Sequence, residues 1–142
     1  MAFIHSYWAY LVLAVIIIAT ANSIIGFVTK REFGAKDFRL ALFALIVTHL
    51  QLVIGLITYF VSDKVQWVND ELNMKDIMGN ADLRLIHVEH PITMIFAIVL
   101  LTIGYSKHKK KLVSTPKFKT LSIFYTLALL AVLSRIPWKM WF

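Results

Sequence analysis

The sequence predicts an all-α integral membrane protein in which four helices cross the bilayer as one bundle. Of its 142 residues, 59% are hydrophobic and only 16% are charged, which is more apolar side chain than a soluble core of this size can bury. The apolar residues fall into four runs, each of roughly 20 residues, the length that crosses a hydrocarbon core of about 30 Å. We therefore expect a single four-helix transmembrane domain over residues 1–142.

The apolar runs place the spans at approximately residues 6–29, 40–61, 85–106 and 121–137. Helices are expected because residues 11–19 and 95–101 are unbroken apolar runs, whereas the strands of a transmembrane barrel alternate in polarity. The first run has neither the basic start nor the small-residue cleavage motif of a signal peptide. We therefore interpret it as the first membrane helix.

The longest connector, residues 62–83, is acidic and joins the second and third spans. Within it, residues 65–72 are expected to form a short helix on the surface. Met74, Ile77 and Met78 form a second apolar turn. Together these turns predict a cap over the outer ends of the helices, with a solvated loop as the alternative.

The distribution of Lys and Arg predicts the orientation, because basic residues in short loops stay in the cytoplasm. The connectors after the first and third spans hold ten of the fifteen Lys and Arg, whereas the opposite side holds six of the eight acids. Both termini are therefore expected outside, in a multi-pass protein of a bacterial inner membrane. All four tryptophans fall near this outer surface, as an interfacial aromatic belt would: Trp8, Trp67, Trp138 and Trp141.

The net charge of +7 comes from residues beside the spans, where they face the lipid bilayer. This placement excludes nucleic acid as a partner. The lysines of residues 107–119 are expected to contact lipid headgroups or the acidic surface of a partner.

The chemistry of the chain falls to its five histidines. The absence of cysteine excludes disulfides, iron–sulfur clusters, thiolate sites and covalently attached haem. His108 lies in the basic run 107–111 and is interpreted as a solvated or lipid-facing loop residue without a role. The other four lie at or inside the membrane, where ionisable groups are usually functional. The structural alternative is a histidine hydrogen-bonded across helices.

His49 lies near the middle of the second span, with no charged residue beside it in the sequence. A neutral imidazole buried there without a partner costs several kcal/mol. Both ring nitrogens have a partner if one of them ligates a metal and the other donates a hydrogen bond to a Thr, a Gln or a backbone carbonyl. His49 is therefore a candidate ligand.

The third span carries two histidines on one helical stripe, which continues through small and apolar residues: His87, His90, Met94, Ala97, Leu101 and Gly104. This stripe is expected to face the bundle. Pro91 removes a backbone donor and frees the carbonyl of His87, which loosens the helix there. Glu89 is expected either to orient an imidazole or to solvate the start of the helix.

A b-type haem fits these residues better than a bare metal ion. Zinc and copper prefer three or four ligands, whereas this haem needs two histidines from facing helices, an apolar slot and basic groups for its propionates. Arg84 and Arg135 are the two arginines on the outer side and are expected near the propionates. The alternative for either arginine is snorkelling to the membrane interface.

The depth of each histidine limits the choice of ligand pair. At 1.5 Å per residue, His49 lies roughly 17 Å below the outer end of its helix and His90 roughly 8 Å below its own. Closing this height difference of about 9 Å requires a helix tilt, which is commonly about 20°, a span boundary that lies elsewhere than predicted, or a distortion at Pro91. Pairing His5 with His87 or His90 is closer in height but lies at the rim. We rank His49 with His90 first and His5 with His87 second, and two sites could coexist.

Four segments resemble a family of small bacterial four-span membrane proteins usually labelled cytochrome b-like: residues 5–8, 48–56, 84–91 and 137–138. The resemblance spans nearly the whole chain and implies a non-covalent b-type haem in a four-helix bundle. More distantly, the second and third spans are similar to the four-helix units of haem A synthase and of cytochrome b561-type proteins. The chain has neither the duplicated half of the former nor the regular paired histidines of the latter, which puts synthase activity in doubt.

These observations favour a membrane-embedded electron-transfer protein, in which a b-type haem in the outer half passes electrons between quinol and a respiratory partner. The alternative is a non-redox small subunit or assembly factor of a larger respiratory or export complex. An enzyme of haem or quinone metabolism is the least favoured class, because only Glu89 among the carboxylates falls near the membrane interior. An electron carrier is therefore expected rather than an enzyme with its own substrate.

Overall fold

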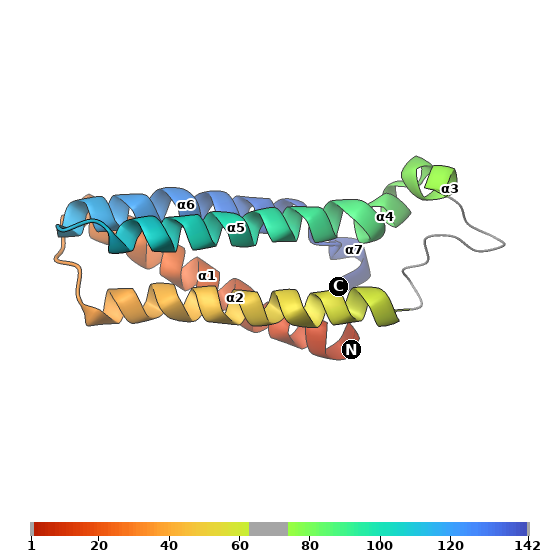
Figure 1. Ribbon diagram of the computed structural model, residues 1–142, viewed down its shortest axis with the longest axis horizontal. Helices are drawn as coiled ribbons and strands as arrows, with labels where there is room; N and C mark the ends of the chain where they lie inside the picture. The colour runs from red at the N-terminus through yellow and green to blue at the C-terminus, as the bar shows by residue number, and fades with distance from the viewer. Residues whose placement is uncertain (1, 63–73, 142) are drawn as a thin grey trace.

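A computed structural model describes residues 2–62 and 74–141, and every regular element within these residues is a helix. Four long helices run side by side in alternating directions (Figure 1): α1 (Ala2–Thr29), α2 (Ala35–Val61), α5 (His90–Lys109) and α6 (Ser114–Ser134). The shorter elements lie at the end of the bundle that carries both termini. They are α3 (Met74–Gly79), α4 (Ala81–Arg84), the π-helix Leu85–Glu89 and α7 (Trp138–Trp141).

Within the described part of the chain, four helices are long and apolar enough to cross a membrane, as the predicted helical, multi-pass architecture requires: Phe3–Thr29, Ala35–Val61, Ala81–Lys109 and Ser114–Ser134. The last of them begins earlier than the predicted residue 121. Lys117 and Lys119 interrupt the apolar run, but lysine is a good helix former and Pro116 fits the first turn. Hydropathy therefore marks the membrane portion of α6 and not the start of the helix.

The acidic connector is described only in its second half. The surface helix predicted over residues 65–72 lies outside the described residues, as does Trp67. The second predicted turn is present as α3, in which Ile77 is fully buried while Met74 and Met78 are exposed.

The centre of the bundle is built from small and β-branched residues at spacings of three and four. Their large neighbours on the outer helix faces, such as Ile18, Phe43 and Phe96, are exposed, as expected of side chains that face lipid. The core comprises Val12, Val15, Ile16, Ala19, Ala41, Ala44, Val47, Ala97, Leu101, Tyr105, Leu121, Tyr125, Ala128, Val132 and Ile136. Two hydrogen bonds cross it: the Tyr125 hydroxyl donates to the Ala41 carbonyl at 2.8 Å, and Trp8 Nε1 donates to the Val47 carbonyl at 2.9 Å.

Two glycines let the helices approach closely at the end with the basic connectors. A Cβ added at Gly26 of α1 would overlap the ring of Phe118, and one added at Gly104 of α5 would overlap the Cβ of Phe124. Both phenylalanines belong to α6. Close approach at small residues is a common way for membrane helices to gain packing contacts. At these two glycines, α1 and α5 thus pack closely against α6 at the basic end.

Replacing Gly104 with Ala is expected to destabilise the protein by about 1–3 kcal/mol, because the added methyl has to displace Phe124. Without that contact, the change would stabilise a helix interior by roughly 0.5–1 kcal/mol. Gly79→Ala is the matched control, since nothing lies within 4 Å of a Cβ there. Thermal unfolding in detergent, followed by circular dichroism, measures the difference. Equal melting temperatures for the two variants would contradict the proposed close contact.

Candidate functional site

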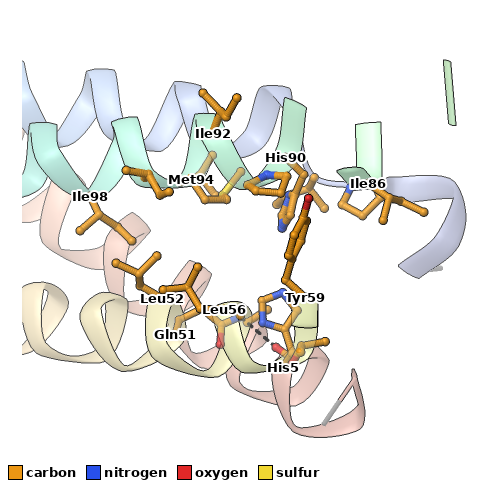
Figure 2. A pocket seen from close by; sticks show the side chains of 18 of the residues that line it. His5, Gln51, Leu52, Leu56, Tyr59, Ile86, His90, Ile92, Met94 and Ile98 are labelled. Carbon is orange, nitrogen blue, oxygen red and sulfur yellow. Dashed lines mark hydrogen bonds between the residues drawn. The ribbon is translucent and has the colours of Figure 1, made fainter. Parts of the chain in front are cut away.

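A pocket of about 510 Å³ lies between α1, α2 and the third span, in the half of the bundle nearer the termini. α2 packs more extensively against α1 than against α5, and the pocket lies on the side of α2 that faces α5. Its walls are mainly apolar. The polar lining includes His5, Gln51, Tyr59, His87 and His90, and Figure 2 shows His5, Tyr59 and His90 at one end of the pocket.

His5 and His90 come from different helices and meet in this pocket. Their ring centroids are 6.1 Å apart and the ring planes are nearly perpendicular, at 82°. The Nδ1 atom of His90 lies 2.9 Å from the Arg135 carbonyl. Because a carbonyl only accepts, Nδ1 carries the proton, which leaves Nε2 of His90 as the nitrogen for a ligand.

α2 holds His5 in place by two contacts. Gln51 Nε2 donates to the backbone carbonyl of His5 at 2.9 Å (Figure 2), and a Cβ added at Gly55 would lie 3.1 Å from His5 Cε1. The imidazole therefore occupies the space left by the glycine. Among the described residues, His5 Nδ1 and Gln51 Oε1 are both buried, and neither makes a hydrogen bond of good geometry, although the Gln51 side chain lies beside the His5 ring. Buried polar atoms of this kind are rare and suit a site that binds another molecule.

The π-helix Leu85–Glu89 positions the two histidines of the third span. The His90 N–H bonds to the Leu85 carbonyl, and the Tyr59 hydroxyl donates to the His87 carbonyl at 2.8 Å. Pro91, which has no N–H, cannot satisfy that carbonyl from within the helix. This confirms the prediction that Pro91 frees the His87 carbonyl. The structure also confirms the predicted stripe, because His87, Ala97, Leu101 and Gly104 are buried and His90 and Met94 line the pocket.

The structure does not bring His49 and His90 together. His49 is exposed, is not among the residues that line the pocket, and its Nδ1 donates to the carbonyl of Leu45 in its own helix at 2.8 Å. The pocket face of α2 includes Thr48, Gln51, Leu52, Gly55 and Tyr59, and a residue one position after Thr48 turns away from it. The hydrogen-bond partner expected for the His49 imidazole is therefore a backbone carbonyl of its own helix. The alternative set of His5, His87 and His90 is the one that shares a pocket.

His87 is almost completely buried, at 2% exposure, and its Nδ1 lies 2.8 Å from the Leu83 carbonyl. It lines the same pocket as His5, so the second-ranked pair is brought to one place. Within the described residues, no group of three or more His, Cys, Asp or Glu could hold a bare metal ion. A metal bound in this pocket would therefore have to be held by only two protein ligands.

The two outer arginines make local contacts beside the pocket. Arg84 Nε pairs with Glu89 Oε2 at 3.3 Å, and an Arg84 guanidinium nitrogen donates to the Met78 carbonyl at 2.9 Å. Arg135 follows the end of α6, with its guanidinium on the Ser134 carbonyl at 2.9 Å. Neither arginine lines the pocket. Of the two roles predicted for Glu89, orienting an imidazole is not seen, because Glu89 pairs with Arg84.

The interpretation of His108 as a solvated or lipid-facing loop residue is wrong. α5 continues to Lys109, and His108 is fully buried, with ring centroids 5.5 Å from Phe33, 6.0 Å from Phe38 and 5.0 Å from Tyr105. The basic neighbours in the sequence concealed this burial, because lysines on the other faces of the same helix turn are exposed. His108 lies near the C-terminal end of α5, away from the pocket at the start of that helix.

Comparison with known proteins gives no match: no protein-family model, no curated protein and no solved structure is similar enough to assign this chain. The resemblance to cytochrome b-like proteins therefore stays a prediction. The pocket has to be interpreted from its own residues.

Replacing Tyr59 with Phe is expected to destabilise the protein by about 1–3 kcal/mol, because it leaves the His87 carbonyl without its donor in a nearly water-free environment. Tyr7→Phe is the control, since Tyr7 is 61% exposed. Thermal unfolding in detergent measures both variants. A Tyr59→Phe protein as stable as Tyr7→Phe would contradict this expectation, because the His87 carbonyl would then not depend on the Tyr59 hydroxyl.

Proposed function

We propose that the pocket binds a non-covalent b-type haem through His5 and His90, and that the protein transfers electrons in the membrane. The observation that carries the proposal is the pair of imidazoles from α1 and the third span, 6.1 Å apart in one apolar pocket. This pair replaces the first-ranked pair of His49 and His90, because His49 faces away from the pocket. His87 remains the alternative partner of His5.

The spacing of the rings supports ligation of one metal by both. A metal bound by two imidazoles at about 2.0–2.1 Å from each nitrogen holds the ring centroids roughly 6 Å apart, and the observed separation is 6.1 Å. The pocket volume of about 510 Å³ falls within the range of cofactor sites, roughly 300–1,000 Å³. The apolar walls suit a porphyrin, which two facing helices can hold without a covalent link.

The hydrogen bond from His90 to the Arg135 carbonyl is the kind of outer contact that metal-ligating histidines usually make. It fixes the tautomer and the orientation of the ring and raises the basicity of the ligating nitrogen. The ring of His5 has no backbone carbonyl as a partner among the described residues, and it is positioned by Gly55 and Gln51 instead. We propose that Arg84 and Arg135, at the same end of the bundle, pair with the propionates.

A bound haem would supply one-electron chemistry, and the residues of this chain would hold it, exclude water and set its potential. The apolar pocket walls favour the less charged state of an iron centre. A membrane-soluble quinol or a respiratory membrane protein is the electron partner that we propose, in a bacterial inner membrane with both termini outside.

The proposal predicts that His5→Ala and His90→Ala each abolish or strongly alter the reduced-minus-oxidised haem spectrum, because each removes a ligand. His49→Ala is the matched control, since it removes a membrane histidine outside the pocket, and His108→Ala removes a buried histidine at the other end. Both controls are expected to keep the wild-type spectrum. The measurement uses protein purified in detergent from haem-replete cells.

Two results would overturn this assignment. Loss of the spectrum in His49→Ala, with a normal spectrum in His5→Ala, would restore the pair of His49 and His90. Absence of a Soret band from the wild-type protein would replace the electron-transfer function with that of a non-redox subunit of a larger membrane complex.

A further inference from the structure

A second cavity, of about 560 Å³, lies at the basic end of the bundle, away from the histidine pocket. We call it the basic cleft. It is lined by one residue of α1, one of α5, one of the following connector and several of α6: Phe27, Lys107, Lys111, Thr115, Pro116, Lys119, Thr120, Ile123 and Phe124. Three of these residues are lysines, and no Asp or Glu is among them.

The packing of α5 on α6 fixes the floor of the basic cleft. Gly104 brings Phe124 against α5, and Lys107 Nζ lies 5.4 Å from the centre of the Phe124 ring. This contact holds an ammonium group at the cleft while its charge stays available to an anion. Lys111 and Lys119 are exposed and add two further ammonium groups.

No Asp or Glu lines the cleft among the described residues, and Asp37, an acid at the same end, has partners of its own. Asp37 pairs with Arg31 at 2.8 Å and also accepts from Asn22 at 2.8 Å, so it is engaged at α1 and the start of α2. The first turn of α6 also lies at the cleft, and the partial positive charge of a helix N-terminus adds to that of the lysines. The cleft therefore attracts a strong anion.

Part of the lining of the basic cleft is apolar and exposed, like the outer faces of the helices. Phe27 and Ile123 line the cleft and are 36% and 47% exposed, and Leu127, one turn beyond Ile123 on α6, is also exposed. A ligand that uses both parts of the cleft must carry a negative headgroup and a hydrocarbon chain. Inorganic phosphate matches only the lysines, whereas a phospholipid matches both parts.

We propose that the basic cleft is a binding site for an anionic phospholipid, with its phosphate on Lys107, Lys111 and Lys119 and an acyl chain along Phe27 and Ile123. Basic pockets between membrane helices suit such headgroups because several ammonium groups converge on one phosphate. The site is independent of the haem proposal, because it shares no residue with the histidine pocket. It extends the expectation of general lipid contact by residues 107–119 to one defined site.

The test measures lipid adducts on the full-length, delipidated protein by native mass spectrometry, after titration with phosphatidylglycerol or phosphatidylcholine. Wild type is expected to prefer phosphatidylglycerol. The double variant Lys107→Gln/Lys119→Gln is expected to bind it about 25-fold more weakly, at about 5-fold for each lysine removed. Lys36→Gln/Lys110→Gln is the matched control, because it removes the same charge at the same end from exposed residues outside the cleft. This control is expected to change the affinity less than 2-fold.

Lys111→Gln provides a second test should the double variant fail to fold, because Lys111 is an exposed connector residue whose replacement leaves the packing of Phe124 intact. Its expected effect is a loss of about 5-fold. Equal losses in the cleft variants and in the control would overturn the site in favour of diffuse surface charge. Equal binding of the two lipids, or displacement of phosphatidylglycerol by millimolar inorganic phosphate, would also overturn it.

Discussion

The hydrogen bond from Tyr59 to the His87 carbonyl answers the strictest constraint on this bundle, which is that backbone polar groups inside a membrane must find partners within the protein. Pro91 removes the donor that the helix would have supplied, so α2 supplies one. The resulting contact ties α2 to the third span beside the pocket. The π-helix next to it turns both His87 and His90 toward the same space, a local irregularity of the kind that often accompanies function.

The two ends of the bundle differ in the kind of side chain that packs against their glycines. At the basic end, aromatic side chains of α6 occupy the space beside Gly26 and Gly104, which brings three helices together. At the other end, the imidazole of His5 occupies the space beside Gly55, which places a group that can ligate a metal at the pocket. The first arrangement builds the floor of the basic cleft, and the second builds one wall of the candidate haem site.

The sequence predicted the four helices and the inward stripe of the third span well, because long apolar runs and helical spacing are properties of the sequence itself. Which histidines share the pocket could be predicted less well. The sequence places His49 near the middle of the second span, but its partner in the structure is the Leu45 carbonyl of its own helix, which no residue pattern reveals. The contacts of Arg135 and His87 through their backbone carbonyls are equally independent of residue type. His108 was misassigned because its burial depends on Phe33 and Phe38, which approach from other parts of the chain.

The proposed ligation of one haem by His5 and His90 is tested most directly by low-temperature electron paramagnetic resonance of the oxidised, haem-replete protein. Two imidazole ligands with nearly perpendicular planes, as the 82° between these rings implies, predict a strongly anisotropic low-spin ferric signal. This signal should account for one haem per chain. A high-spin ferric signal, as a single axial histidine would give, or the absence of any haem signal would contradict the claim.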